Sequence, residues 1–384
     1  MTGYFRGLMR IGIDFTSATR ERAGIGRYAR ELIRALARLD RENRYSLFVP
    51  RDAHNDLLRF NWTSNFAIKR APLTERILAA LWHKARVPLF VEAFIGAVDV
   101  FYSPDFLLPP TRARRTIVTI HDLSYVRVPE CFPDVLKQYL NRAVPRALDR
   151  ADLILADAIS TQRDLTEVYA VPLDKIKVLY SGVDARFRPD VAEDAKSRVR
   201  ELTRDKPYLL SVSTIQPRKN YVRLIEAFAR LTSNFQLPTF TLQLVIAGGR
   251  GWMYDEVYHA VEQLNLRERV LFPNFVADDD LPALYAGATL FVYPSLYEGF
   301  GLPIAEAMAC GAPVVSSNAS SLPEVAGDAA LYFDPRDVDA MANAMHRALS
   351  DAALRDELRA RGLAQARKFS WEKAARELLQ YLEG

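Results

Sequence analysis

The chain has 384 residues, 49% of them hydrophobic and 26% charged, which suits a folded globular protein with two domains of roughly 150–200 residues each. The first 190 residues carry 30 lysines and arginines against 22 acids and the rest 21 against 25, which favours two units with different partners over chance variation between solvated surfaces. Two distant cysteines and the absence of a long apolar run argue against a disulfide scaffold, a signal peptide and a membrane span, and favour a cytoplasmic protein.

Short apolar runs bounded by Gly, Pro or Asn alternate with longer segments through the first half of the chain. They predict strands at 9–15, 44–50, 98–103, 115–120, 151–157 and 175–180. A helix is expected at 26–39. Residues 181–190 have the Gly and Pro content of a linker.

The second half repeats this alternation more clearly. Strands are predicted at 208–214, 242–249, 269–276, 289–295 and 312–317. Helices are predicted at 220–231, 253–264, 280–286, 302–310, 337–349, 351–367 and 371–382. Strands that are apolar on both faces and alternate with helices indicate a doubly wound parallel sheet. We therefore predict an α/β protein with two Rossmann-like domains, 1–185 and 190–368, that face each other across a cleft, with ligands at the carboxyl ends of the strands.

Two carboxylates occur close together in "PSLYEGFGLPIAEAMACG". Glu298 follows a predicted strand, in a loop whose Gly299 and Gly301 expose backbone N–H groups, and Glu306 is expected in the first turn or so of helix 302–310. Glu306 could simply complement the helix dipole, or the two acids could form the acid and nucleophile of a glycosidase. Alternatively, each carboxylate could accept hydrogen bonds from the hydroxyls of a sugar or a ribose.

Two other strand ends carry polar side chains. Arg218 and Lys219 come at the start of helix 220–231, where two cations beside a helix N-terminus favour a phosphate site over a solvated pair. His121 directly follows strand 115–120, so it is a candidate for the reacting centre as well as for a structural histidine with satisfied hydrogen bonds.

Two further motifs are weaker. Gly24 and Gly26 in "ERAGIGRYAR" resemble a dinucleotide fingerprint, but nine residues separate Asp14 at the strand end from Gly24, so a flexible glycine loop at the mouth of the cleft is preferred. Asp278 and Asp280 in "VADDDLPALY" have the D-x-D spacing of a metal site, although Asp280 also suits a helix N-cap. The second interpretation is preferred, and no metal is expected.

Residues 73–96 form a basic amphipathic stretch that includes Arg76, Lys84 and Arg86. Such a stretch can lie on an anionic membrane, which would place the protein at the inner face of the plasma membrane. The packing of an ordinary helix against a core would give the same pattern.

Together these motifs resemble the GT-B retaining glycosyltransferases of family 4, also called glycosyl transferases group 1. The resemblance covers nearly the whole chain. Its specific part is Glu298-x7-Glu306 within "EGFGLPIAEAMACGAPVVSS", supported by "PRKN", "GIGRY", "HDL" and the "SSLPEV" run at 320–325. The "GIGRY" and "HDL" motifs look most like the bacterial mannosyltransferases of surface polysaccharide assembly.

The resemblance implies roles for the glycine loop. Glu298 would hold hydroxyls of the donor sugar, and Glu306 would hold the ribose. Backbone N–H groups of Phe300, Gly301 and Leu302 would hold the sugar and the diphosphate.

It implies further roles elsewhere in the chain. Arg218 and Lys219 would bind the diphosphate, His121 would lie near the reacting centre, and the loop from Gly24 to Gly26 would close over the donor. Some relatives carry an additional arginine near the start of the phosphate loop, where this chain has serine at position 213. In many members the C-terminal helix, here 371–384, packs back on the first domain.

The implied activity is a metal-independent, cofactor-free transfer of a hexose, with mannose from GDP-mannose preferred and a UDP-sugar as the alternative. The implied acceptor is a saccharide or a lipid-linked molecule, and no nucleic acid is expected as a partner. An NAD-dependent dehydrogenase, a glycoside hydrolase and a sugar-binding module without activity are the other classes considered. The nucleotide bound distinguishes the three enzymes.

Overall fold

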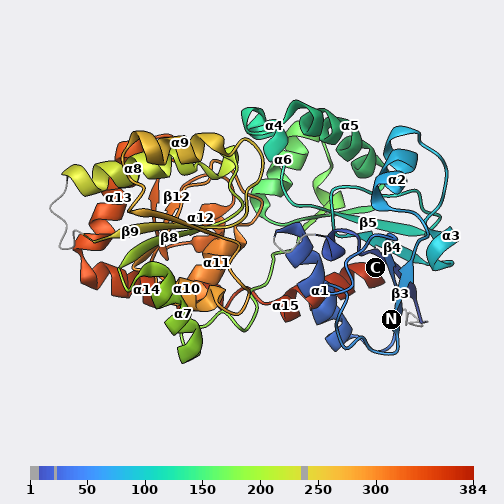
Figure 1. Ribbon diagram of the computed structural model, residues 1–384. Helices are drawn as coiled ribbons and strands as arrows, with labels where there is room; N and C mark the ends of the chain where they lie inside the picture. The colour runs from blue at the N-terminus through green and yellow to red at the C-terminus, as the bar shows by residue number, and fades with distance from the viewer. Residues whose placement is uncertain (1–7, 21–23, 235–240) are drawn as a thin grey trace. The chain divides into compact units, whose positions relative to one another are not determined.

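The structure is a computed structural model that describes residues 8–20, 24–234 and 241–384 (Figure 1). The chain forms two compact units. Unit 1 comprises the described residues up to Leu123, together with Gln138–Gly182 and Ser370–Gly384. Unit 2 comprises Ser124–Lys137 and Val183–Phe369, so a short segment from the first half of the chain belongs to the second unit.

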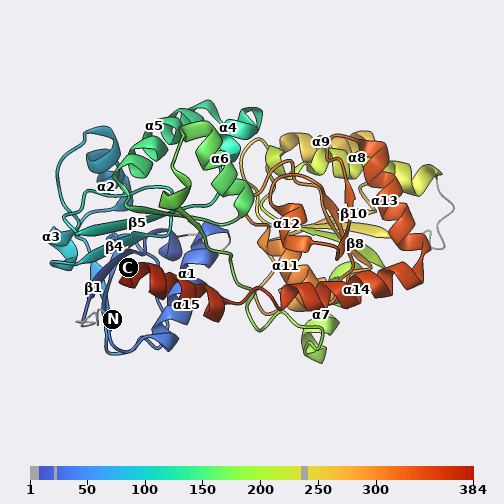
Figure 2. The same cartoon turned by 180° about the vertical axis from the view of Figure 1, so that it is seen from behind.

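Unit 1 is built on a seven-stranded sheet with the order β3-β2-β1-β4-β5-β6-β7, and every neighbouring pair is parallel. Its strands are β1 (Arg10–Asp14), β2 (Arg44–Val49), β3 (Phe66–Arg70), β4 (Val100–Ser103), β5 (Arg115–Ile120), β6 (Leu153–Ala156) and β7 (Ile176–Val178). The longer helices are α1 (Ile25–Leu39), α5 (Asp134–Arg150, which enters unit 1 at Gln138), α6 (Ile159–Tyr169) and α15 (Trp371–Glu383). Helices α5 and α6 cover one face of the sheet, and α1 and α15 cover the other (Figures 1 and 2).

Unit 2 has a six-stranded parallel sheet with the order β10-β9-β8-β11-β12-β13. Its strands are β8 (Tyr208–Val212), β9 (Gln243–Ala247), β10 (Val270–Asn274), β11 (Leu290–Tyr293), β12 (Val314–Ser317) and β13 (Ala330–Phe333). Its helices are α4 (Ser124–Arg127), α7 (Glu193–Thr203), α8 (Tyr221–Asn234), α9 (Asp255–Gln263), α10 (Leu281–Ala286), α11 (Leu302–Ala309), α12 (Leu322–Ala326), α13 (Val338–Ser350) and α14 (Ala352–Ala366). Helices α8, α9 and α13 lie on one face, and α10, α11 and α14 lie on the other (Figure 1).

The predicted doubly wound parallel sheets are confirmed in both units. Strands β9, β11 and β12 are buried along their whole length, because helices cover both faces and leave no solvated side. Strands β3 and β13 were not predicted from the sequence. In β3 only Phe66 is buried, and the strand ends in Lys69 and Arg70 at the edge of the sheet, so it lacks the apolar run that identifies an inner strand.

The amphipathic stretch 73–96 is not one helix. Helix α2 (Glu75–Ala79) continues into a π-helical turn, Ala80–Lys84, and a second short helix, α3, covers Glu92–Ile95. The break between them contains Arg86 in the left-handed region and Pro88. Among the residues that the structure describes, no helix is both long enough and apolar enough to cross a membrane.

Helix α15 belongs to unit 1 although it follows the whole of unit 2 in the chain. It packs along α1, and the ring of Trp371 meets that of Tyr28 edge-on at 5.9 Å between centroids. The helix begins where the Ser370 hydroxyl accepts the backbone N–H of Lys373. The backbone of Gly182 lies so close to this start that a Cβ there would be 2.1 Å from the Trp371 nitrogen. Position 182 therefore requires glycine.

Replacing Gly182 by alanine should lower the free energy of unfolding by about 1–3 kcal/mol, because the added methyl forces the backbone of residue 182 away from α15. Gly249→Ala is the matched control, since a Cβ there would meet no described atom within 4 Å. Differential scanning calorimetry of both variants measures the difference. Equal melting temperatures would show that α15 does not constrain position 182.

Candidate active site

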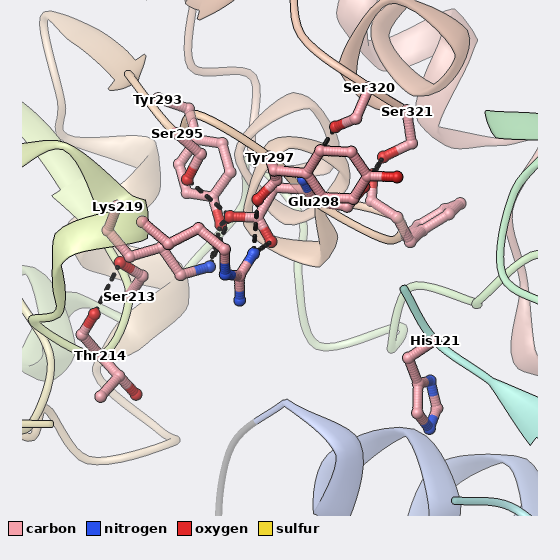
Figure 3. Close-up of polar contacts among 12 residues, drawn as sticks. His121, Ser213, Thr214, Lys219, Tyr293, Ser295, Tyr297, Glu298, Ser320 and Ser321 are labelled. Carbon is pink, nitrogen blue, oxygen red and sulfur yellow. Dashed lines mark hydrogen bonds and ion pairs between the residues drawn. The ribbon is translucent and has the colours of Figure 1, made fainter. Parts of the chain in front are cut away.

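Arg218, Lys219 and Glu298 lie together in unit 2, at the carboxyl ends of two neighbouring strands. The cations follow β8 and the acid follows β11. These two strands are where the strand order of the sheet changes direction, the place where ligands bind in open parallel sheets. Two groups that the sequence suggested separately, a cation pair and a carboxylate, therefore form one cluster (Figure 3).

Four side chains contact the carboxylate of Glu298. Its Oε1 accepts from Lys219 Nζ at 2.5 Å, from the Ser295 hydroxyl at 2.6 Å and from the Tyr293 hydroxyl at 3.0 Å. Its Oε2 accepts from Arg218 at 2.8 Å. Lys219 also donates to the Tyr293 hydroxyl at 3.1 Å. Figure 3 shows Lys219, Tyr293 and Ser295 converging on the carboxylate.

The cluster is buried, and its charges determine the protonation of Glu298. Only 6% of Glu298 and 8% of Lys219 are exposed. Burial alone would raise the pKa of Glu298, but the charges of Arg218 and Lys219, with hydrogen bonds from Lys219 and Ser295, lower that pKa to about 2. Glu298 is therefore ionised at neutral pH. The two cations and one carboxylate together carry one positive charge.

The backbone around the two cations differs from the prediction in one detail. Arg218 and Lys219 lie in a separate 3-10 turn, Pro217–Lys219, and helix α8 starts only after Asn220. Asn220 adopts the left-handed conformation with φ = 61°, which asparagine tolerates better than most residues. Its amide donates to the carbonyls of Pro294 at 3.0 Å and Pro335 at 2.7 Å. Asn220 thus connects the loops after β8, β11 and β13, a role that sequence analysis missed.

Two serines of the "SSLPEV" run hold the glycine loop from the other side. The Ser320 hydroxyl accepts the backbone N–H of Glu298 at 2.8 Å, and the Ser321 hydroxyl lies 3.1 Å from the carbonyls of both Glu298 and Phe300. The ring of Phe300 packs edge-on against Phe369 at 5.2 Å. These contacts fix the backbone that leads into helix α11.

The predicted site residues of the glycine loop take different places at the start of helix α11. Gly301 is its N-cap with φ = 96°, a conformation that favours glycine, and Leu302 is its first residue. Gly299 is buried in the preceding loop. Glu306 is the fifth residue of the helix, directly after the first turn and close to its predicted place. Its carboxylate is buried and accepts from the Tyr285 hydroxyl at 3.0 Å.

His121 lies in unit 1, directly after β5, and both of its ring nitrogens have partners. Nδ1 lies 2.7 Å from the carboxylate of Asp157, and Nε2 lies 3.1 Å from the carbonyl of Pro104. Since a carbonyl can only accept, Nε2 carries a hydrogen. Burial lowers the pKa of His121, but the charge and hydrogen bond of Asp157, helped by Asp105, raise it to about 9. His121 is therefore an imidazolium at neutral pH and not a free base.

The ends of the neighbouring strands of unit 1 carry further acids that sequence analysis did not propose. Asp14 ends β1, Asp105 comes two residues after β4, and Asp157 directly follows β6. Burial raises the pKa of Asp14 to about 6, with a hydrogen bond from Thr16 lowering it and the charge of Asp105 raising it. The rule that identified His121, a polar residue directly after a buried strand, fits Asp157; Asp14 and Asp105 lie within two residues of their strand ends and need a wider rule.

Gly24 and Gly26 lie at the start of α1 in unit 1. Gly24 is the N-cap with φ = 56°, and Gly26 is buried in the first turn, so the helix starts at Ile25, one residue earlier than predicted. Residues 21–23 of the "ERAGIGRYAR" motif lie outside the described residues. The positive φ explains why glycine is needed at position 24.

Asp278 and Asp280 each face an arginine in unit 2. The Arg198 guanidinium donates to the Asp280 carboxylate at 2.8 Å, and Arg186 lies 3.9 Å from Asp278. Asp280 precedes α10, as predicted, but its carboxylate bonds to Arg198 and does not cap the helix. Across the described residues, no group of three or more His, Cys, Asp or Glu side chains is arranged to hold a metal ion.

Two family models together cover most of the sequence, and a known protein is similar to it along nearly its whole length. Residues 193–367 match "Glycosyl transferases group 1", and residues 22–187 match "Glycosyltransferase Family 4". The chain is 35% identical, over 93% of its own length and 94% of the other, to the O-antigen chain mannosyltransferase B of Escherichia coli.

Solved structures of lower identity share the fold. Sucrose-phosphate synthase from Thermosynechococcus elongatus superposes with a TM-score of 0.76 at 22% identity, covering 97% of this chain and 98% of that one. HepE from Anabaena in complex with UDP-glucose superposes with a TM-score of 0.73 at 20% identity, covering 97% and 99%. At these identities the likeness concerns the arrangement of the chain and not its ligands.

Replacing Glu298 by glutamine should lower the free energy of unfolding by about 3–5 kcal/mol at pH 7, because Arg218 and Lys219 then lose their buried counter-charge. The folded pKa lies below the ordinary value of about 4.3, so the carboxylate stabilises fully above that value and loses its effect as the pH falls toward 2. The difference between wild type and variant should narrow over this window.

Urea unfolding at a series of pH values measures the effect. Glu256→Gln, which removes an exposed carboxylate from α9 of the same unit, is the control and should change little. A Glu298→Gln effect that is as small as the control, or that does not vary with pH, would contradict the assigned ion pairs.

Proposed function

The chain belongs to the family 4 glycosyltransferases, the glycosyl transferases group 1, and is an enzyme with the GT-B fold; from this premise we propose that it moves mannose from GDP-mannose to a saccharide or lipid-linked acceptor. The proposed transfer is metal-independent and retains the configuration of the sugar. It takes place on the cytoplasmic side of the membrane, in the synthesis of a surface glycan. Membership of the family removes the dehydrogenase, the glycoside hydrolase and the inactive sugar-binding module from consideration.

The observation that carries the proposal is the buried cluster of Arg218, Lys219 and Glu298 at the carboxyl ends of β8 and β11. In the reaction, the bond between the anomeric carbon and the diphosphate oxygen breaks while the acceptor oxygen bonds to that carbon. The proton of the acceptor hydroxyl passes to the departing diphosphate on the same face. Negative charge therefore grows on the diphosphate, and fixed cations stabilise it without having to reorganise.

Each remaining residue has a role in this proposal. Glu298 accepts hydrogen bonds from hydroxyls of the sugar while it holds Arg218 and Lys219 in place. The diphosphate is held by the backbone N–H groups of Phe300, Gly301 and Leu302. Gly299 allows the loop to approach the donor closely. Glu306 binds the ribose. Glu298 and Glu306 therefore act as binding groups and not as covalent nucleophiles.

In unit 1, His121 and the glycines are assigned to the reacting centre. His121 supplies a fixed positive charge, because its pKa of about 9 keeps it protonated at neutral pH and its two N–H groups are held by Asp157 and the carbonyl of Pro104. Gly24 and Gly26 give the start of α1 a backbone that can approach the donor closely. The carboxylates of Asp14 and Asp105 can accept hydrogen bonds from the hydroxyls of the saccharide that receives the sugar.

The donor is proposed from the relatives. Similarity to an O-antigen mannosyltransferase over nearly the whole chain supports mannose and, with it, GDP-mannose. A UDP-sugar is the second candidate, since a protein of the same fold has been solved with UDP-glucose. For the acceptor, the basic stretch 73–96 favours a lipid-linked molecule at an anionic membrane surface.

A thermal-shift assay without added metal should show that GDP raises the melting temperature more than UDP does. A ligand at about 100 times its dissociation constant adds about 2.7 kcal/mol to the stability of the folded state. ADP, which fits neither proposed donor, is the control. A clear preference for UDP would overturn the mannose assignment and leave the fold and the glycosyltransferase activity untouched.

Steady-state kinetics should separate the proposed roles. Lys219→Ala should lower kcat by about 10²–10³-fold, because the charge on the diphosphate grows only as the bond breaks. Glu306→Ala should mainly raise the KM for the donor, because the ribose is held alike before and during the reaction. Glu298→Ala should fall between the two.

Lys196→Ala, which removes a half-exposed cation from α7 that pairs with Glu193, is the matched control and should leave both constants unchanged. EDTA should change none of these rates. Detection of a glycosyl adduct on Glu298 by intact mass spectrometry would refute its binding role. Dependence on Mg²⁺ or Mn²⁺ would refute the metal-independent mechanism.

A further inference from the structure

A cavity of about 440 Å³ lies in unit 1, beside the segment that connects α2 to α3. Its lining includes residues of the π-helical turn and the C-terminal end of α5. The carbonyl of Arg150, at that end, accepts from the hydroxyl of Thr116, the second residue of β5. The cavity is therefore at the amino edge of the sheet, opposite to the strand ends that carry His121. It is separate from the proposed active site.

The wall of this cavity is rich in cations. Arg86, Arg146 and Arg150 line it, whereas Asp149 is the one acid among its described lining residues. The Arg150 guanidinium donates to the carbonyls of Leu108 at 2.9 Å and Pro109 at 2.7 Å, which fixes its position. Within the described residues, Arg86 and Arg146 form no hydrogen bond or ion pair. The cavity therefore has a surplus of positive charge that an anion can compensate.

His83 and an apolar floor complete the cavity. Burial, together with the charges of Arg150 and Arg146, lowers the pKa of His83 to about 4, so the imidazole is neutral at pH 7. Trp82 and Phe90 belong to the floor. Val87, which also lines the cavity, is 38% exposed. The cavity thus combines cations with apolar surface, as a ligand with a charged end and an apolar end requires.

The backbone here departs from regular geometry in two ways. Residues Ala80–Lys84 form a π-helical turn, which is rare and is frequently found at functional sites. Arg86 has φ = 57°, a left-handed conformation that costs energy in any residue with a Cβ. Strain of this kind is kept where the surrounding structure gains something from it. Here it places Arg86 on the wall of the cavity.

We propose that this cavity binds the phosphate headgroup of an anionic lipid, with Arg86 and Arg146 bonding the phosphate and the apolar floor contacting the glycerol and the first part of the chains. Arginine suits a phosphate because its planar guanidinium donates two parallel hydrogen bonds. The site anchors unit 1 to an anionic membrane, and in this it deepens the proposed function by defining the surface at which a lipid-linked acceptor is met. A soluble phosphate ester offers the same chemistry, so the experiment tests both sources.

The experiment uses the full chain and needs no transferase activity. Binding to vesicles of phosphatidylcholine, alone or mixed in equal parts with phosphatidylglycerol, is measured by co-sedimentation, and binding of glycerol 3-phosphate is measured by calorimetry. Two variants remove cations from the cavity. Arg86→Gly also relieves the left-handed backbone, so it removes the charge without destabilising the fold. Arg146→Gln removes the charge from α5.

Each variant has a matched control outside the cavity. Arg204→Gly makes the same change at another left-handed arginine, with φ = 53°, in unit 2. Arg142→Gln makes the same change at an exposed arginine one turn earlier on α5 that does not line the cavity. The proposal expects the wild type to bind the phosphatidylglycerol vesicles, each cavity variant to bind them at least about tenfold more weakly, and each control to bind as wild type does.

Three results would overturn the proposal. In the first, the wild type fails to bind the anionic vesicles. In the second, it binds neutral and anionic vesicles equally well. In the third, the control substitutions weaken binding as much as the cavity substitutions do, which would indicate a general effect of charge. Binding of glycerol 3-phosphate without binding of vesicles overturns the lipid as ligand and identifies a soluble phosphate ester. Since all these measurements are independent of sugar transfer, they fail or succeed separately from the proposed activity.

Discussion

A carboxylate that is buried away from water needs a cationic partner. At Glu298 this need determines how the loops of unit 2 are arranged. The cost of burying an isolated ion is several kcal/mol, and Arg218 and Lys219 offset it from the neighbouring strand. The loops after β8 and β11 are therefore held at the spacing of two charge-assisted hydrogen bonds. Asn220 and Ser320 fix the same loops through the backbone. The result is a positive site whose geometry exists before any ligand arrives.

The two units use the same position in the sheet for opposite charges. In unit 2, two cations and one acid gather where β8 meets β11. In unit 1, Asp14 and Asp105 gather where β1 meets β4, with the pair of His121 and Asp157 on the next strands. The halves of the chain have the reverse balance, basic in the first and acidic in the second. Net charge therefore says little about the chemistry at the strand ends, which depends on a few buried groups.

Much of this arrangement could be predicted from the sequence, because burial on both faces gives parallel strands a distinctive apolar pattern. Elements such as β11 and α11 were found within two residues of their ends, and Glu298 and Lys219 were identified from their positions after strands. That the two form an ion pair could not be seen, since it depends on the lateral order of β8 and β11. The π-helical turn before Arg86 could not be seen either, because its residues keep the pattern of an ordinary amphipathic helix.

The packing of α15 on α1 has a consequence for how the protein is made. A ribosome releases domains in chain order, and each usually folds as it emerges. Here α1 appears early, but its partner helix emerges only after the whole of unit 2. During most of synthesis, the apolar face of α1 that later contacts Trp371 has no native cover. Unit 2 can complete its own sheet first, and the first unit to be synthesised is the last to be finished.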